Sequence, residues 1–227
     1  MKQPKNIWRW IVGAVLFAAL ALTAGPFIYI HFIKGDAPSE LAFSDPGTAT
    51  GTAVPIDGTW QPTPASVFGY RVKEILFGQS TDAAGRTNKV TGEIKIDGTS
   101  LVSGQLTVDM TSVKSDDSRR DGQLRGRIMD TAKFPTATLK LAKPADFGSV
   151  PANLVEITVN VTADLTLRGT TKTIPVALKA RRNGANIEVN GNVPIVFADW
   201  NIPNPSSSIA KTEDHGVLEF LVVFAKV

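Results

Sequence analysis

The sequence predicts a mainly β protein, with about eight antiparallel strands that close into a barrel or sandwich, preceded by one transmembrane helix. Three observations predict this architecture. Residues 10–33 contain no Asp, Glu, Lys or Arg. Residues 34–55 are dominated by small, polar and proline residues. After Pro55, apolar and polar residues alternate with the period of two that is typical of strands with one buried face.

Composition excludes several classes of protein. The chain has 227 residues, of which 43% are hydrophobic and 20% charged, with a net charge of +3. Its Lys and Arg residues are dispersed, which argues against binding of nucleic acid. Without cysteine there are no disulfides, thiolate catalysis or cysteine metal sites, and two histidines are too few for a histidine-rich metal site. We expect no cofactor.

The first element is the predicted transmembrane helix at residues 10–33. A helix of this length extends roughly 36 Å, enough to cross a hydrocarbon core of about 30 Å. Lys2, Lys5 and Arg9 precede it. Because cations favour the cytoplasmic side, residues 1–9 should be cytoplasmic and the remainder of the chain extracytoplasmic. The predicted location is therefore the cell membrane, with a single pass.

A cleaved signal peptide is the alternative interpretation of this segment. The small-residue pattern at residues 19–21 suits a signal peptidase. The apolar run continues well beyond it, which favours an uncleaved anchor. Both interpretations place the C-terminal domain outside the cytoplasm.

Residues 34–55 are expected to form a flexible linker with almost nothing to bury, and residues 56–227 the β domain. The clearest strand is at 155–167, where seven apolar residues alternate along one face. Turns are expected at Asp97-Gly98, Arg168-Gly169 and Asn183-Gly184. The other predicted strands lie at 68–72, 90–96, 106–110, 174–180, 187–197 and 217–227, the last apolar on both faces.

One polar segment interrupts the strands. Residues 115–129 show no alternation, and acidic residues precede basic ones, as suits a helix dipole. We expect a short helix there with Ser115 as its N-cap. Whether the barrel interior is filled by side chains or hollow is left open.

Two stretches carry a resemblance to a known family. Residues 105–141 contain Arg120-Asp121-x-x-Leu124-Arg125 and Phe134-Pro-Thr-x-Thr, and residues 161–178 contain Leu165-Thr-Leu-x-Gly-x-Thr-Lys. From Ile56 to the C-terminus the chain resembles the YceI-like, polyisoprenoid-binding family of lipocalin-like proteins, and a weaker match covers 214–227. The resemblance implies an extended antiparallel barrel with an isoprenoid chain in its core, and a carrier rather than an enzyme.

The sequence departs from the family pattern near the short helix. Gln123 stands where the family commonly has His, and Ile128 and Met129 replace an aromatic pair. These changes leave the preferred lipid head group open.

A polyprenyl tail requires apolar walls, because its burial is worth about 25 cal/mol per Å² whatever its chemistry. The candidate wall residues are Phe68, Tyr70, Leu106, Val108, Phe134, Leu139, Leu165, Leu167, Phe197 and Trp200. The candidate contacts for an anionic head group are Arg119, Arg120, Arg125 and Arg127. The alternatives are ordinary core packing for the first set and a solvated helix end for the second.

Other functions have less support from the sequence. Asp214-His215 and the serines at 206–208 are the residue types of a hydrolase triad, but adjacent strand residues should point to opposite faces, so we expect no enzyme. Asp116 and Asp117 lack the spacing of a Ca²⁺ loop, so no metal is expected. The other class is a surface scaffold with a filled barrel that binds a protein through the loop at 201–208. The sequence leaves homodimer formation open.

Overall fold

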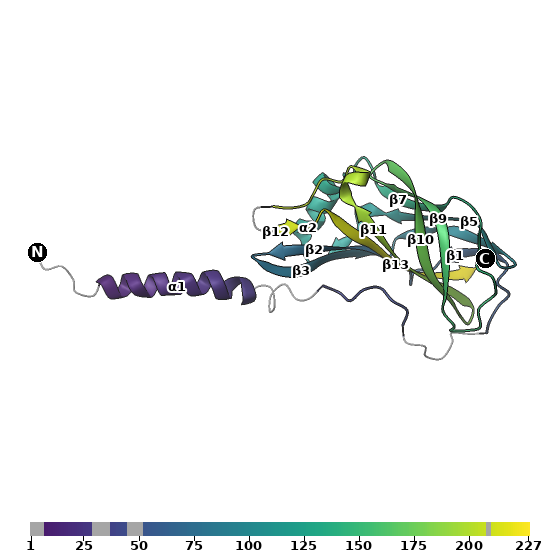
Figure 1. The fold of residues 1–227 in the computed structure, drawn as a ribbon, viewed down its shortest axis with the longest axis horizontal. Coiled ribbons are helices and arrows are strands. Elements are labelled where there is room, and N and C mark those ends of the chain that lie inside the picture. The colour runs from purple at the N-terminus through teal and green to yellow at the C-terminus, as the bar shows by residue number, and fades with distance from the viewer. Residues whose placement is uncertain (1–6, 29–36, 45–51, 208–209) are drawn as a thin grey trace, which may run out of the picture.

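A computed structural model describes residues 7–28, 37–44, 52–207 and 210–227 of the chain. One long helix stands apart from an elongated β-barrel that carries the short helix α2 at one end (Figure 1). The helical elements are α1 (Ile7–Ile28), η2 (Met110–Ser112), α2 (Ser118–Gln123), η3 (Leu124–Ile128) and η4 (Phe197–Trp200). The strands are β1 (Gly58–Pro62), β2 (Val67–Leu76), β3 (Gln79–Thr87), β4 (Val90–Asp97), β5 (Ser100–Asp109), β6 (Lys114–Ser115), β7 (Thr136–Leu141), β8 (Ala145–Asp146), β9 (Ile157–Leu167), β10 (Thr170–Asn183), β11 (Asn186–Val196), β12 (Ala210–Thr212) and β13 (His215–Lys226).

Eight strands close the barrel, in the order β1-β4-β5-β7-β9-β10-β11-β13, with β13 pairing back to β1. All of these pairings are antiparallel. At the other end of β13, the hairpin β2–β3 continues the sheet and reaches β6. Closure of the barrel gives hydrogen-bond partners to the backbone N–H and C=O groups that would be unpaired at the edges of an open sheet. The predicted mainly β fold with a closed antiparallel barrel and a short helix is confirmed.

The alternating pattern predicted the long strands correctly, because each of these strands has one face in the core. In β9, Val159, Val161, Ala163, Leu165 and Leu167 are all buried. The turn at Arg168-Gly169 has positive φ at both residues, as a tight hairpin requires. Six strands were not predicted from the alternation: β1, β3, β6, β7, β8 and β12. β3 reads QSTDAAGRT and has too few large apolar side chains to show alternation.

The predicted helix at 115–129 is present but shorter, as α2 followed by the π-helical turn η3. The predicted N-cap was wrong: Asp117, not Ser115, accepts a hydrogen bond from the Arg119 N–H, at 2.8 Å. Ser115 belongs instead to β6, where its N–H and hydroxyl both donate to buried Asp121.

At the N-terminus the helix α1 begins at Ile7 and ends at Ile28, whereas the prediction was 10–33, and residues 29–33 lie outside the described residues. Within the described part of the chain, no helix is long and apolar enough to cross a membrane. The predicted transmembrane helix is therefore not confirmed.

The predicted linker at 34–55 forms neither helix nor strand where it is described, at 37–44 and 52–55. Residues 37–44 nevertheless hydrogen-bond to the outside of the barrel, for example through Pro38 and Leu41. This coverage explains why β13 is apolar on both faces: its outward residues Leu221 and Val223 are only partly exposed.

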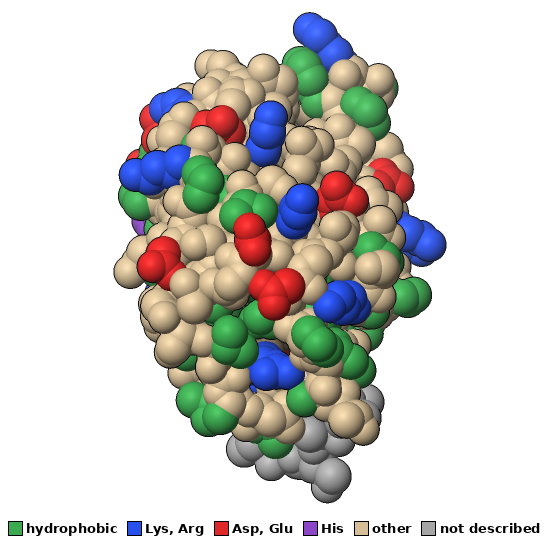
Figure 2. Space-filling model, turned by 90° about the vertical axis from the view of Figure 1, so that its right-hand side faces the viewer, with side chains coloured by type: hydrophobic (Ala, Val, Ile, Leu, Met, Phe, Trp, Pro, Cys, Tyr) green, Lys and Arg blue, Asp and Glu red, His purple; other side chains and the backbone are tan. Residues whose placement is uncertain are grey.

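The barrel end away from α1 faces the viewer in Figure 2. Lys and Arg side chains are mixed there with Asp and Glu, and hydrophobic side chains are scattered between them. This face therefore lacks the basic patch that nucleic-acid binding would require.

Candidate functional site: an apolar cavity open at one end of the barrel

A cavity of about 1060 Å³ occupies the end of the barrel that carries α2 and β12. Ligand pockets typically measure roughly 300–1,000 Å³, so this one suits a large ligand. Its wall comes from β2, β9, β11, β13 and the helical turns around α2, and Ala21 and Gly25 of α1 also line it. The wall includes Val72, Leu76, Met110, Val113, Leu124, Met129, Leu167, Ile195, Phe197 and Leu218.

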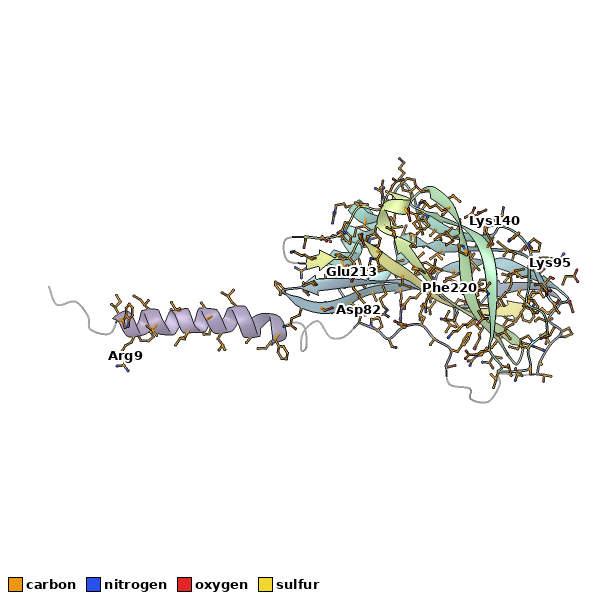
Figure 3. All side chains as sticks on the ribbon, viewed as in Figure 1. Arg9, Asp82, Lys95, Lys140, Glu213 and Phe220 are labelled. Atoms are coloured by element: carbon orange, nitrogen blue, oxygen red, sulfur yellow. The ribbon has the colours of Figure 1, made fainter. Side chains whose placement is uncertain are left out.

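The interior narrows towards the middle of the barrel. A second cavity of about 20 Å³ and a third of about 70 Å³ follow the first. Phe68 and Leu218 line both the main cavity and the second one. The Phe68 ring stacks on Phe220, with centroids 6.4 Å apart and planes inclined by 9°, and Phe220 lies near the middle of the barrel (Figure 3). These side chains form a partition across the core.

Polar residues gather at the rim of the main cavity, where α2 meets β2. Arg120 is central: its Nη2 lies 3.2 Å from Glu74 Oε1, and its Nη1 pairs with Asp116. Burial acts to lower the pKa of Arg120, but the carboxylates of Glu74 and Asp116 outweigh it and raise that pKa above its ordinary value. The guanidinium is therefore permanently charged and already paired.

Tyr70 lies on the inward face of β2, four residues before Glu74 and on the same face. Burial raises the pKa of its phenol to about 12, and the carboxylates of Asp121, Asp116 and Glu74 act in the same direction against Arg120. The hydroxyl is thus a neutral group at neutral pH, able to donate or accept a hydrogen bond.

The predicted wall residues divide into three groups. Phe68, Tyr70, Leu167 and Phe197 line the main cavity. The second cavity is lined by Phe68 again and by Leu106, Val108, Leu139 and Leu165. Phe134 and Trp200 line neither of these cavities: the Phe134 ring packs against Gly169, and buried Trp200 donates its Nε1–H to Leu165 O at 3.3 Å.

The predicted head-group arginines divide as well. Arg119 and Arg120 line the main cavity. Arg127 donates instead to the carbonyl oxygens of Asn204 and Pro205, at 3.2 and 3.3 Å, and so fastens the loop after η4. Arg125 is also absent from the residues that line this cavity.

Sequence reasoning missed Glu74, Met110, Val113 and Ile195 as cavity residues. For Glu74 a signal existed, because it continues the alternation Phe68, Tyr70, Val72 onto the inner face, where a carboxylate is unexpected. The loop at 201–208 is exposed at Asn201, Asn204, Ser206 and Ser207, and it also contributes Ile202, Pro205 and Ser207 to the cavity, while Ser208 lies outside the described residues.

The expected separation of Asp214 and His215 was wrong. His215 Nδ1 lies 2.9 Å from Asp214 Oδ1, because Asp214 precedes β13 and does not share its alternation. Both side chains are exposed, and the Ser206 hydroxyl donates to Thr212 O rather than to His215. Over the described residues, no group of three or more His, Cys, Asp and Glu side chains is placed to hold a metal.

Comparison with known proteins agrees with this geometry. The chain is 31% identical over 135 residues to UPF0312 protein VPA0850 of Vibrio parahaemolyticus, covering 55% of this chain and 67% of that protein. A UPF0312 protein of Vibrio campbellii is 30% identical with the same coverage.

Two solved structures share the fold. One is a polyisoprenoid binding domain from Saccharophagus degradans implicated in plant cell wall breakdown, with a TM-score of 0.62, 21% identity, and coverage of 75% of this chain and 99% of that one. The other is BcnA of Burkholderia cenocepacia, with a TM-score of 0.58, 24% identity, and coverage of 71% and 98%. The sequence model of the YceI-like domain family matches residues 60–224, which is most of the chain. The protein belongs to the YceI-like family.

Proposed function

We propose that the barrel binds a long apolar lipid of the polyisoprenoid type, with its chain in the main cavity and its polar end at the rim. The cavity carries this proposal: it measures about 1060 Å³, its deeper wall is apolar, and its polar side chains gather at the rim where α2 meets β2. Such a division suits a molecule with one polar end, because apolar burial drives binding and the few polar groups set its orientation. The structural similarity to a polyisoprenoid binding domain supports the same class of ligand.

Native mass spectrometry of the full chain, purified from its host membrane fraction, tests the proposal. We expect a mass shift that organic extraction removes, and an extracted lipid whose fragments repeat at isoprene spacing. Recovery of only unmodified protein, from preparations kept in mild detergent throughout, would count against it.

The rim favours a neutral polar head group over a diphosphate. Three carboxylates, Glu74, Asp116 and Asp117, face two guanidiniums, Arg119 and Arg120. The rim therefore carries a net charge of −1, and Arg120 is already paired with two of these carboxylates. A diphosphate would have to displace them. A hydroxyl or carbonyl head can instead bond to the Tyr70 hydroxyl without adding charge.

The partition at Phe68 sets how deep the chain reaches. Beyond Phe68 and Leu218 the free volume falls to about 20 Å³. A chain longer than the main cavity must therefore bend within it or displace the Phe68 ring. The bound lipid should be of limited length.

We propose in addition that the N-terminal segment attaches the protein to a cell membrane, with residues 1–9 cytoplasmic and the barrel extracytoplasmic. The charge-free stretch continues to Ile33, beyond the described end of α1. On α1 itself, Trp8, Phe17 and Leu22 are 71%, 73% and 78% exposed and so available to lipid. Fractionation with protease protection tests this: the barrel should sediment with membranes and be digested from the extracytoplasmic side only. Recovery in the soluble fraction would contradict it.

The same site favours a lipid carrier over a scaffold that binds a protein partner. The main cavity is hollow, which does not support the alternative of a scaffold with a filled barrel. The loop through which that scaffold would bind a protein partner is fastened by Arg127 and lines the cavity.

A further inference from the structure

A row of polar side chains crosses the outside of five neighbouring strands. We call it the outer stripe: Arg71 on β2, Arg86 on β3, Glu219 on β13, Asn190 on β11 and Arg181 on β10. These side chains lie outside the barrel, since the alternate residues Leu218 and Phe220 of β13 point inward. Yet Glu219 is only 1% exposed and Arg181 only 2%. Residues 37–44 lie across them.

The outer stripe holds these residues through their main chain. Arg71 Nη2 donates to Pro38 O at 2.6 Å, and Arg86 donates to Ser39 O. Asn190 Nδ2 donates to Leu41 O at 2.7 Å, and Arg181 Nη2 donates to Ser44 O at 3.0 Å. The sole side-chain anchor among these contacts is Phe43, whose ring centre lies 4.6 Å from the Arg181 guanidinium.

The stripe is organised by its own ion pairs. Glu219 Oε1 lies 2.9 Å from Arg86 Nη2 and 3.4 Å from Arg71 Nη2, so both guanidiniums are held in place while their remaining N–H groups reach the peptide. Gly69 makes room for this arrangement: a Cβ there would come within 2.9 Å of Arg86 Cγ. The surface therefore fits an extended peptide backbone.

The register gives the direction of the bound segment. Pro38 contacts Arg71, which pairs with Val217, a residue that lines the main cavity. Ser44 contacts Arg181, which pairs with Glu188 and so lies level with Val223, near the opposite end of β13. Residues 37–44 thus run from the cavity mouth towards the far end of the barrel. The N-terminal end of this segment therefore lies on the side of the mouth.

We propose that residues 37–44 form a docked strap that keeps the cavity mouth turned towards the N-terminal helix. Eight residues, 29–36, separate Ile28 from Ala37. Fully extended, they span at most about 30 Å, so the mouth stays within that distance of α1. If residues 34–55 formed a free linker, the barrel could take any orientation relative to α1, and its distance from α1 could be more than twice as large. If the helix sits in a membrane, which rests on the proposed function, the mouth faces the bilayer and a lipid enters without crossing water.

Spin-label distances in the full chain test the strap, because the chain has no native cysteine. Leu22→Cys on α1 is combined either with Gly122→Cys at the mouth, where a side chain meets open space, or with Lys95→Cys at the far end (Figure 3). We expect narrow distributions in detergent, with the mouth distance shorter by on the order of 20 Å, as the length of a strand requires. Broad, overlapping distributions would overturn the proposal.

The double variant Arg71→Ala/Asn190→Ala removes the side chains that donate to Pro38 O and Leu41 O, while residues 37–44 stay unchanged. Buried Glu219 keeps its ion pair with Arg86 in this variant. Both distributions should then broaden and their difference should shrink by at least half. Glu40→Gln, an exposed side chain in the same segment, is the matched control and should change neither. Unchanged distances in the double variant would show that the strap does not orient the barrel. Because no lipid is needed, loss of lipid binding with narrow distances would remove the proposed function and leave the strap intact.

Discussion

Arg120 and Glu74 meet across the rim of the cavity, with Nη2 3.2 Å from Oε1, and join the short helix α2 to the inner face of β2. The Arg120 side chain is 19% exposed and that of Glu74 only 9%. The pair therefore links the short helix at the mouth to the wall that contacts the proposed lipid.

Removing one member of this pair should cost more than removing both. Arg120→Gln takes the guanidinium from a nearly buried carboxylate, and we expect a loss of about 1–3 kcal/mol in the free energy of unfolding. Adding Glu74→Gln should restore part of it, with a coupling of about 1 kcal/mol or more. Urea unfolding of the two single variants and the double variant gives the cycle. Additive losses would mean that the contact is not energetically coupled.

Shortening the partition should lengthen the lipid that the protein accepts. Phe68→Ala joins the main and second cavities, so longer chains should bind, at a stability cost of about 2–4 kcal/mol because the ring also packs in the core. Mass spectrometry of bound lipids from a mixture of chain lengths measures the shift. Val72→Ala, which lines the main cavity alone, is the control and should leave the length distribution unchanged.

Tyr70 should titrate far above its ordinary pKa of 10, at about 12, because burial favours its neutral form. Since the folded-state pKa is raised, the stability that this group contributes is complete below pH 10 and is lost between about pH 10 and 12. In a Tyr29→Phe background Tyr70 is the only tyrosine. Tyrosinate absorbance after stopped-flow pH jumps reads its midpoint before unfolding; a midpoint near 10 would indicate a solvated phenol.

The cap of α2 should control access to the cavity. Asp117→Ala removes the acceptor for the Arg119 N–H and should cost about 1 kcal/mol, loosening the helix at the mouth. Release of a fluorescent lipid should accelerate several-fold. Asp117→Asn keeps an acceptor that caps helices well and should behave like the unchanged protein; equal acceleration in both variants would point to charge rather than capping.

Long one-sided strands were predictable because burial of one face leaves a period of two in the sequence, as in β9 and β10. β3 was not predicted because its inner face carries small residues: Ala83 borders the cavity, and Gly85 makes room for the Tyr70 ring. The cavity itself was not predictable. Whether Phe68 and Leu167 fill the interior or only line it depends on how the strands close around them, which alternation does not record.

Only part of the candidate site was predicted, because the sequence does not show which side chains the fold turns towards the cavity. Arg119 and Arg127 are similar in sequence context, and only the folding of η3 turns Arg127 to the loop at Asn204 and leaves Arg119 at the cavity. The strap was missed because its contacts use backbone carbonyls, such as Ser44 O, which any sequence offers. The outer stripe that holds the strap did have a signal in the sequence, because Glu219 is a carboxylate within the most apolar strand.

The most direct measurement of the central claim is a crystal structure of the full chain purified with its bound lipid. The account predicts continuous electron density for an apolar chain between β2 and β13, ending against Phe68 and Leu218, with its polar end within hydrogen-bond distance of Tyr70 or Arg120. A cavity that holds only water, in protein whose preparation retains lipid elsewhere, would contradict it.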